Sequence, residues 1–307
     1  MLEVQAREAI EQAAGRKGLT GKPLAALTTL GCGGPAALVI EADSRAHLAG
    51  ILEAAQSMNV PWFVLGHGSN LLVADEGWDG LVITLGSEFR ECHRNGERLS
   101  CGGAATLPRV ARIASGAGLS GLEPLAYIPG TIGGALAINA GAYGTSIGDL
   151  VVEAQVCLPG EVKTISAQNL GFGYRTSGVP AGSVVSRVVL EMKQGDPETI
   201  SGKMLDMRRQ REASQPVREK SCGSVFKNPD GEKSAGQLLD EAGCKGLVSS
   251  GAAVSDIHAN FIINRGNATA HDVLDLMDEC RRRVNDAFGV VLEPEVRFLG
   301  NLELKSL

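Results

Sequence analysis

Apolar residues in the first third of the chain follow the spacing of a β-α-β unit. They recur at the i, i+3, i+4, i+7 spacing of one helix face, at Leu48, Ile51, Leu52 and Ala55. Continuous apolar runs flank this helix and predict buried strands, over residues 36–40, 60–65 and 81–85. An alanine- and glutamate-rich segment, residues 2–14, predicts one more helix, which ends at Gly15.

The middle of the chain predicts a short helix and further strands. Thr106 is in position to cap a helix that has Pro108 in its first turn and ends at Gly116. The polar residues 90–100 before it predict a loop. Two strands are expected after it, over residues 151–158 and 183–192.

Two capping boxes predict helix starts in the last third, Ser234 with Gln237 and Thr269 with Asp272. The second helix is expected to end at Gly289 and to bury one apolar face, made of Val273, Leu274, Met277, Cys280, Val284 and Phe288. A basic helix and two strands complete this part, over residues 201–215, 260–264 and 290–298. A composition break at residues 194–197 predicts a domain boundary, and the 307 residues exceed one typical domain.

Composition narrows the functional classes. The net charge of −6 gives no reason to expect a nucleic acid partner. The seven cysteines are odd in number, scattered and never in a C-x-x-C pair, so we predict reduced thiols, no metal site and a cytoplasmic location. The N-terminus has no apolar core of a leader peptide, and the chain has no run of about 18 apolar residues, so neither export nor a membrane span is expected. Nothing in the sequence gives the oligomeric state.

Two glycine-rich loops are the most informative segments, residues 66–73 and 130–144. Glycine is present at 40 positions of 307, about twice the usual share of roughly 7%. Because exposed main-chain N–H groups in such loops bind anions, we expect a dinucleotide held from two sides through its diphosphate. The alternative is a pair of tight turns that only connect core elements.

Three polar residues outside these loops are candidates for chemistry. Ser224 lies in a glycine-containing segment, residues 221–229, where a serine is also a common turn former. Alternation along the last predicted strand points Glu295 away from the apolar face, where it is either functional or a solvated carboxylate. Arg175 follows Tyr174 in a glycine-broken segment and is equally compatible with a surface ion pair.

Taken together, these motifs resemble the bacterial UDP-N-acetylenolpyruvoylglucosamine reductase family. The resemblance spans residues 28–300, with its motifs in the family's order. From Val184 onward the chain joins the C-terminal domain without an inserted tyrosine-bearing loop, and in this it resembles the shorter subtype of the family. It implies an α+β chain with a two-subdomain FAD-binding fold of the vanillyl-alcohol-oxidase (PCMH) type and a C-terminal α/β substrate domain. The implied domains are two FAD-binding subdomains and a substrate domain, over residues 1–88, 89–195 and 196–307.

The resemblance also implies the ligands and their sites. FAD would be bound by both glycine loops, at Gly66, His67, Gly68, Ser69, Asn70, Leu71, Pro129, Gly130, Thr131, Gly133, Gly134, Asn139 and Gly141. His67 stands where the family often has glycine, which leaves open whether it affects flavin attachment. The sugar nucleotide would be bound at Tyr174, Arg211, Lys227 and Asn228, with the diphosphate near the basic cluster that contains Arg211.

The implied reaction is the NADPH-dependent reduction of an enolpyruvyl ether through FAD, which completes UDP-N-acetylmuramate for peptidoglycan. In it, Arg175 and Glu295 would stabilise charge on the substrate carboxylate. Ser224 would donate a proton to the adjacent carbon, with Lys227 as the cation that tunes it. Two other readings stay open: a flavin-dependent oxidase of the same fold that acts on an alcohol, and a nonenzymatic flavin- or nucleotide-binding module.

Overall fold

The computed structural model describes residues 2–307 as a mixed α and β chain that divides into two compact units. Unit 1 comprises the described part of Met1–Thr20 together with Ala37–His67 and Gly80–Arg209. Unit 2 is made of Gly21–Ala36, Gly68–Asp79 and Gln210–Leu307. Each unit therefore combines segments that are far apart in the sequence, and the division into three domains stays a prediction.

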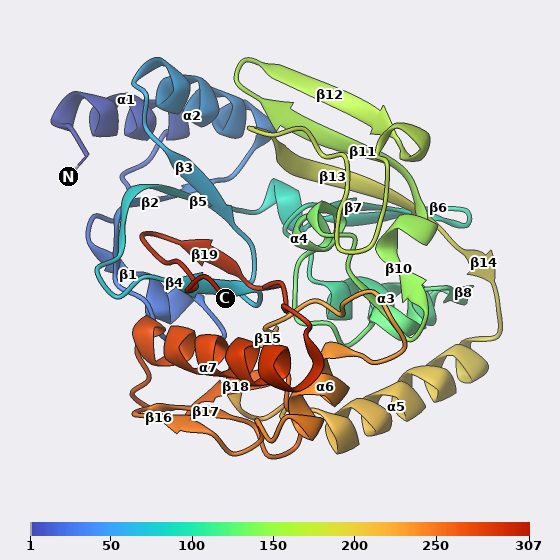
Figure 1. Ribbon diagram of the computed structural model, residues 1–307. Helices are drawn as coiled ribbons and strands as arrows, with labels where there is room; N and C mark the ends of the chain where they lie inside the picture. Colours follow the sequence, from blue (N-terminus) through green and yellow to red (C-terminus); the bar gives the residue numbers. More distant parts are fainter. Residues whose placement is uncertain (1) are drawn as a thin grey trace. The chain divides into compact units, whose positions relative to one another are not determined.

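The predicted β-α-β unit forms the first part of unit 1. Strand β3 (Trp62–Leu65) pairs parallel with β5 (Trp78–Leu85), so that Val64 lies opposite Ile83. Strand β2 (Pro35–Ala42) is the other neighbour of β5. Helix α2 (Arg45–Ser57) buries its predicted apolar face, Leu48, Ile51, Leu52 and Ala55. Helix α1 (Val4–Ala14) lies beside α2 and ends, as predicted, at Gly15 (Figure 1).

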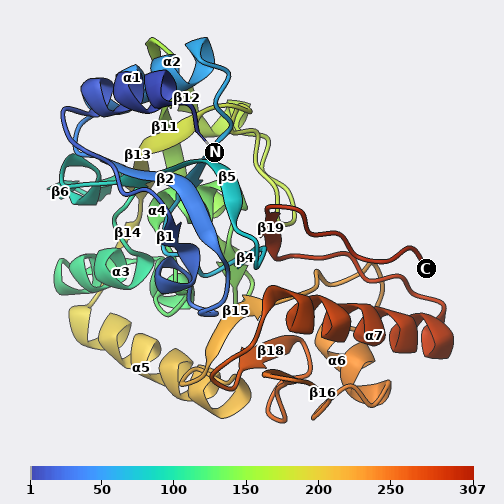
Figure 2. The same cartoon turned by 90° about the vertical axis from the view of Figure 1, so that its left-hand side faces the viewer.

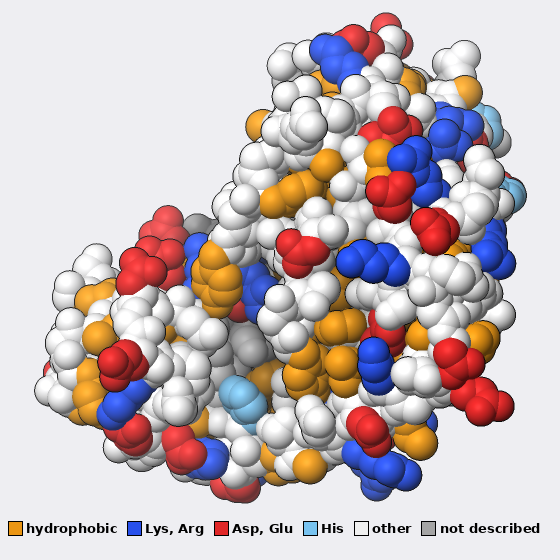
Figure 3. All heavy atoms as spheres, turned by 90° about the vertical axis from the view of Figure 1, so that its right-hand side faces the viewer, with side chains coloured by type: hydrophobic (Ala, Val, Ile, Leu, Met, Phe, Trp, Pro, Cys, Tyr) orange, Lys and Arg blue, Asp and Glu red, His pale blue; other side chains and the backbone are white. Residues whose placement is uncertain are grey.

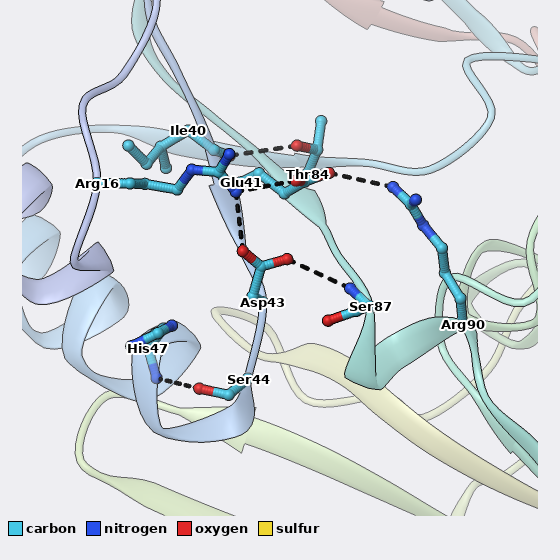
Figure 4. A network of polar contacts seen from close by, with 9 residues as sticks. All are labelled: Arg16, Ile40, Glu41, Asp43, Ser44, His47, Thr84, Ser87 and Arg90. Carbon is cyan, nitrogen blue, oxygen red and sulfur yellow. Dashed lines mark hydrogen bonds and ion pairs between the residues drawn. The ribbon is translucent and has the colours of Figure 1, made fainter.

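A network of exposed ion pairs ties these elements to the next turn of the chain (Figure 4). Arg16 bonds both Glu41 and Asp43 at 2.9 Å. Glu41 also pairs with Arg90, at 3.1 Å, at the end of the 3₁₀ turn η2 (Glu88–Arg90). Each exposed pair contributes only about 0–1 kcal/mol. The network matters more for geometry, because it fixes where the chain leaves β5 and enters the following hairpin.

An antiparallel sheet forms the second part of unit 1, in the order β12-β11-β13-β7-β6. Its strands are β6 (Cys92–Asn95), β7 (Arg98–Gly102), β11 (Val151–Leu158), β12 (Glu161–Ser166) and β13 (Val184–Glu191). The predictions of β11 and β13 are confirmed. The predicted loop over residues 90–100 is wrong, because this segment is the β6–β7 hairpin, turned at Gly96 with φ of 61°. Most side chains of β6 face solvent, which explains the missing apolar signal.

Helix α3 (Leu107–Gly116) begins after Thr106, as predicted, and buries Val110 and Ala114 against this sheet's core. Helix α4 (Ile132–Ala137) lies within the second glycine stretch. Short strands complete the unit, at β8 (Leu119–Ser120), β9 (Gly141–Ala142), β10 (Thr145–Ser146) and β14 (Lys193–Gln194). Short 3₁₀ turns lie between them, at η3 (Glu123–Leu125), η4 (Ile147–Asp149) and η5 (Ala167–Asn169).

Helix α5 (Pro197–Ser214) begins four residues before the predicted start. Asp196 caps it by accepting a hydrogen bond from the Thr199 N–H at 2.8 Å. The Asp-Pro pair that suggested a break is therefore a helix start, since aspartate is a preferred cap and proline fits the first helical position.

Unit 2 is built on an antiparallel sheet in the order β15-β18-β17-β16. Its strands are β15 (Lys220–Ser224), β16 (Val248–Ser249), β17 (Ala252–Val254) and β18 (Phe261–Asn264). Both predicted capping boxes are present, at the starts of α6 (Ala235–Glu241) and α7 (Ala270–Phe288). Helix α7 packs on β16 and β17. It also packs against α6 (Figure 2). Phe288 was expected to be buried, but it is 37% exposed because it lies on the last turn.

The long strand predicted over residues 290–298 is wrong. Only β19 (Arg297–Leu299) is a strand, and it pairs parallel with β4 (Leu71–Val73). Pro294 lacks the N–H that a continuous ladder needs, and it forms only an isolated bridge with Phe226. The predicted alternation of burial holds, because Leu292 and Val296 are buried. The first segment of the unit adds β1 (Lys22–Pro23) and η1 (Leu24–Leu27).

The surface is mixed in charge. Figure 3 shows one face, on which lysine and arginine side chains alternate with aspartate and glutamate. Such mixing keeps the electrostatic field on that face local. Within residues 2–307, no helix combines the length and the apolar character that crossing a bilayer requires.

Candidate active site

In unit 1 the start of the first glycine loop lies against the second glycine stretch. A Cβ added at Gly66 would lie 2.7 Å from the Thr131 hydroxyl, so only glycine allows this approach. Thr131 is buried and caps α4, because its hydroxyl accepts a hydrogen bond from the Gly134 N–H at 3.2 Å. Gly66 and Gly134 are both exposed. The two loops thus present bare main chain on either side of one threonine.

The amides at the start of α4 are used inside the protein. The Ile132 N–H donates to the Ala105 carbonyl and the Gly133 N–H donates to the Gly103 carbonyl, both at 2.8 Å. The N–H groups of Ile132, Gly133 and Gly134 thus donate within the protein, and the assignment of Gly133 and Gly134 to the cofactor stays a prediction. Glycine at position 133 instead allows the close packing, because its Cβ would lie 3.0 Å from the Gly103 carbonyl oxygen.

Asn139 connects the second glycine stretch to the Tyr174–Arg175 turn. The side-chain NH₂ of Asn139 donates to the Gly173 carbonyl at 2.9 Å, and its side-chain oxygen accepts from the Gly148 N–H at 3.0 Å. Asn139 is buried and has a positive φ of 43°. It is therefore a structural bridge between two loops that the sequence treated separately.

Arg175 sits at the tip of this turn in a left-handed backbone conformation, with φ of 53°. Such a conformation is uncommon for a residue with a side chain. One guanidinium nitrogen lies 3.5 Å from the Gly141 carbonyl, and the guanidinium carbon lies 5.3 Å from the centre of the exposed Tyr174 ring. The turn thus holds a half-buried cation next to the second glycine stretch.

In unit 2 Ser224 ends strand β15 at an irregular point of the sheet. The register with β18 shifts between Ser221 and Ser224, and Gly223 between them has a φ of 79°. A bulge of this kind redirects the side chain that follows it. Ser224 is half-buried and pairs with Phe261. The serine is thus at a strand end, where the sequence suggested a turn.

Glu295 is held beside this strand end by its own main chain. Its N–H donates to the Val225 carbonyl at 2.8 Å, and its carbonyl accepts from the Asn70 side chain at 3.1 Å. The Asn70 carbonyl in turn accepts from the Arg297 N–H at 3.2 Å. The second half of the first glycine loop, the serine strand and the glutamate segment therefore meet within unit 2.

The sequence reading missed the importance of Asn260. Its side chain accepts from the Phe226 N–H at 3.0 Å and donates to the Phe226 carbonyl at 2.8 Å, two residues after Ser224. Asn260 is only 3% exposed. Asn260 begins the strand predicted over residues 260–264, and no pattern in the sequence indicates that its side chain bonds to the serine strand.

The remaining candidates lie in unit 2 around its loops. The Lys227 ammonium pairs with the Glu293 carboxylate at 3.2 Å. Asn228 accepts from the Ala235 N–H at 3.0 Å at the start of α6. Arg211 is half-buried in the last turn of α5.

The two units divide the predicted site residues between them. Unit 1 contains Gly66, His67, Pro129, Gly130, Thr131, Gly133, Gly134, Asn139, Gly141, Tyr174 and Arg175. Unit 2 contains Gly68, Ser69, Asn70, Leu71, Arg211, Ser224, Lys227, Asn228 and Glu295. The first glycine loop thus passes from one unit to the other after His67.

Two profiles of known protein families match this chain, one in its N-terminal half and one in its C-terminal part. The profile of an FAD binding domain matches residues 36–166. The profile of the UDP-N-acetylenolpyruvoylglucosamine reductase C-terminal domain matches residues 215–299. Together these matches cover more than half of the chain.

Whole proteins and a solved structure agree with the profiles. UDP-N-acetylenolpyruvoylglucosamine reductase of Heliobacterium modesticaldum is 43% identical over 282 residues, which are 91% of this chain and 90% of that protein. The protein of the same name from an Anaeromyxobacter species is 41% identical over 301 residues, 98% of this chain and 94% of the relative. The crystal structure of UDP-N-acetylenolpyruvylglucosamine reductase from Thermus caldophilus is 40% identical and matches with a TM-score of 0.80, covering 91% of this chain and 98% of that one.

These matches confirm the predicted fold, an FAD-binding fold of the vanillyl-alcohol-oxidase type followed by a C-terminal α/β domain. They also confirm FAD as the cofactor class and an oxidoreductase as the enzyme class. On the strength of two domain profiles and of relatives that match nearly from end to end, the chain belongs to the UDP-N-acetylenolpyruvoylglucosamine reductase family.

Proposed function

We propose that this chain reduces UDP-N-acetylglucosamine enolpyruvate to UDP-N-acetylmuramate with NADPH as the reductant. The step belongs to peptidoglycan precursor synthesis, and both NADPH and nucleotide sugars are cytoplasmic metabolites, so we propose a cytoplasmic location. The observation that carries the proposal is the meeting of Asn70, Ser224 and Glu295 in unit 2, because it joins a glycine loop to a hydroxyl and a carboxyl group.

The residues present fit FAD. Gly66 and Gly134 expose main chain beside Thr131, and a side chain at Gly66 would strike the threonine hydroxyl. Since the amides of α4 are used internally, the diphosphate contacts fall to the loop residues, at Gly66, His67, Gly68, Ser69, Asn70, Leu71, Pro129, Gly130 and Thr131. When bound, FAD supplies the hydride chemistry that no protein side chain provides.

Ser224 is proposed as the proton donor to the substrate carbon. Ser224 ends its strand at a bulge, which redirects the side chain that follows, and Asn260 fixes the main chain after the serine. General acid catalysis of this kind contributes roughly 10²- to 10⁴-fold to the rate.

Arg175 and Glu295 are proposed to stabilise the charge that develops on the substrate carboxylate. A guanidinium offers two parallel donors to a carboxylate. The left-handed backbone at Arg175 directs its side chain toward the second glycine stretch at Gly141. Main-chain bonds on both sides hold Glu295 beside the end of the serine strand, which fixes the segment that carries its carboxyl group.

Tyr174, Arg211, Lys227 and Asn228 are proposed to bind the sugar nucleotide. Arg211 would contact the diphosphate as a fixed cation. We expect Arg211→Ala to raise the KM for the sugar nucleotide more than it lowers kcat, because a phosphate contact is made equally in the ground state and the transition state. A fall in kcat at unchanged KM would contradict this role.

The flavin spectrum of the purified protein tests the proposal. We expect bound FAD that is bleached by NADPH and reoxidised by the enolpyruvyl sugar nucleotide without oxygen. Ser224→Ala should leave bleaching by NADPH nearly intact while lowering reoxidation by the substrate at least about 10²-fold.

Ser221→Ala is the matched control, because Ser221 is half-buried in the same strand and alanine keeps its main-chain carbonyl, which accepts a hydrogen bond from the Thr29 hydroxyl at 2.6 Å. It should leave both half-reactions unchanged. Equal losses of both half-reactions in Ser224→Ala would refute the role of Ser224. A protein that binds no FAD would refute the function itself.

A further inference from the structure

Two cysteines face each other across the β6–β7 hairpin of unit 1. The strands are antiparallel, and their register places Cys92 opposite Cys101. Between the two strands the chain makes a tight turn at Gly96, which has a φ of 61°. Directly opposed residues project their side chains to the same face of a sheet.

The hydrogen bonds show which kind of pair this is. The Gly102 N–H donates to the Glu91 carbonyl at 2.8 Å, so Glu91 and Gly102 form a hydrogen-bonded pair. Pair types alternate along an antiparallel ladder, so the next pair, Cys92 with Cys101, is of the non-hydrogen-bonded type. Its Cα atoms are typically about 4.5 Å apart, within the range of about 4.4–6.8 Å that a disulfide spans.

The two thiols already touch and differ in access. They hydrogen-bond to each other, and Cys92 packs against the apolar core under the sheet to which Cys101 belongs. Cys101 is fully buried, whereas Cys92 is half-buried on β6, the edge strand of the sheet. A small oxidant can therefore reach the Cys92 thiol from solvent, whereas the Cys101 thiol is shielded from solvent.

Electrostatics make Cys92 the more reactive thiol. The hydrogen bond with Cys101 lowers the pKa of Cys92, and the positive charge of Arg109 lowers it further. The same hydrogen bond and burial raise the pKa of Cys101. The thiolate is the form that attacks oxidants.

The hairpin is fixed at its base, so the pair is held in place. Arg90, which precedes β6, is bonded through its side chain to Glu41 at 3.1 Å (Figure 4). The Arg90 carbonyl also accepts a hydrogen bond from the Arg109 guanidinium. The register is thus set by a turn at one end and by these bonds at the other.

We propose that Cys92 and Cys101 form a reversible disulfide when the protein meets a peroxide. The Cys92 thiolate attacks one peroxide oxygen, the O–O bond breaks, and the departing oxygen leaves as water, so that Cys92 becomes a sulfenic acid. The Cys101 sulfur then attacks the Cys92 sulfur, the S–O bond breaks and a second water leaves. Overall two thiols lose two electrons to one hydrogen peroxide, and a dithiol reductant reverses the change.

Peptide mapping after brief treatment of the intact protein with hydrogen peroxide tests this site. Remaining thiols are blocked with an alkylating agent and the chain is cut with trypsin, which separates Cys92 from Cys101 at Arg94 and Arg98. We expect the reactive thiols to fall from seven to five, with one linked peptide pair and full recovery after dithiothreitol.

The protein contains a matched control pair, Cys244 and Cys280, whose thiols also hydrogen-bond. Both are buried, at 0% and 1% exposure, so this pair should stay reduced in the folded protein. Cys92→Ser, at a half-buried edge position, should leave all six remaining thiols reduced, because Cys101 is out of reach.

Three results would overturn the proposal. One is oxidation of Cys92 to sulfinic acid without a linked peptide. Another is a disulfide at Cys244 and Cys280 that forms as fast as the proposed one. The third is loss of the Cys101 thiol at an unchanged rate in Cys92→Ser. None of these readouts depends on bound FAD or on catalytic activity.

Discussion

Replacing Asn260 with alanine should destabilise unit 2 at the strand that carries Ser224. Two hydrogen bonds join the Asn260 side chain to the N–H and carbonyl of Phe226, at 3.0 and 2.8 Å. Phe226 is 1% exposed and Asn260 is 3% exposed, so water does not replace the lost partner. Alanine removes both bonds and leaves two buried main-chain groups unsatisfied.

The magnitude follows from these two groups. A buried polar group that loses its partner costs about 1–3 kcal/mol. The two groups belong to one residue and relax together, so we expect Asn260→Ala to lower the free energy of unfolding by about 2–4 kcal/mol. Because the Val225 N–H still donates to the Asn260 carbonyl, the main chain keeps one bond and the strand should still form.

Urea unfolding followed by circular dichroism measures the loss, and hydrogen exchange of the Phe226 amide localises it. Asn267→Ala is the control, an exposed asparagine in the same unit, and should change stability by less than about 0.5 kcal/mol. Turnover should also fall, because Ser224 loses its support. A cost below about 1 kcal/mol, or unchanged exchange at Phe226, would refute the argument that this side chain fixes the serine strand.

Two further predictions concern other parts of the chain. The hydrogen bond to the Asp75 carboxylate, 2.7 Å from the ring, raises the pKa of His271 above its usual 6.5. The stability that this pair contributes is therefore complete below pH 6.5 and is lost as the pH rises through the raised pKa of His271. An NMR titration of His271 should show a midpoint above 6.5 that falls in Asp75→Asn. Equal midpoints in the two proteins would contradict the pairing. Gly103→Ala should destabilise by about 1–3 kcal/mol or more in thermal unfolding, because its Cβ would lie 2.0 Å from the Val185 carbonyl oxygen. Gly116→Ala, at a helical site where a Cβ meets open space among the described residues, should instead stabilise by about 0.5–1 kcal/mol, and equal effects of the two changes would contradict the steric argument.

Local sequence rules predicted most helices of this chain. The apolar face of α2, the two capping boxes and the glycine ends of α1 and α7 all depend on residues within about four positions of each other. The family and the FAD-binding fold were also recognised from motifs, since these combine a local glycine pattern with their order along the chain.

The errors arose where distant segments decide the structure. The edge strand β6 exposes most of its side chains, so its hairpin has no apolar alternation to detect, and the Cys92–Cys101 pair was hidden with it. Pro294 interrupts the last predicted strand. Where β19 begins is fixed by its pairing with β4, a strand far away in the sequence. The bonds of Asn260 to Phe226 span 34 residues, a distance over which composition gives no information.

The parallel pairing of β4 with β19 can form only late during synthesis of the chain, because the two strands are far apart in the sequence. Leu72 leaves the ribosome 226 residues before its strand partner, Phe298. A nascent chain must therefore keep an apolar strand edge exposed while that length is made, and unpaired edges are prone to wrong associations. Termination before Arg297 would leave the first glycine loop without its partner strand, so this loop can be ordered only after β19 has been made.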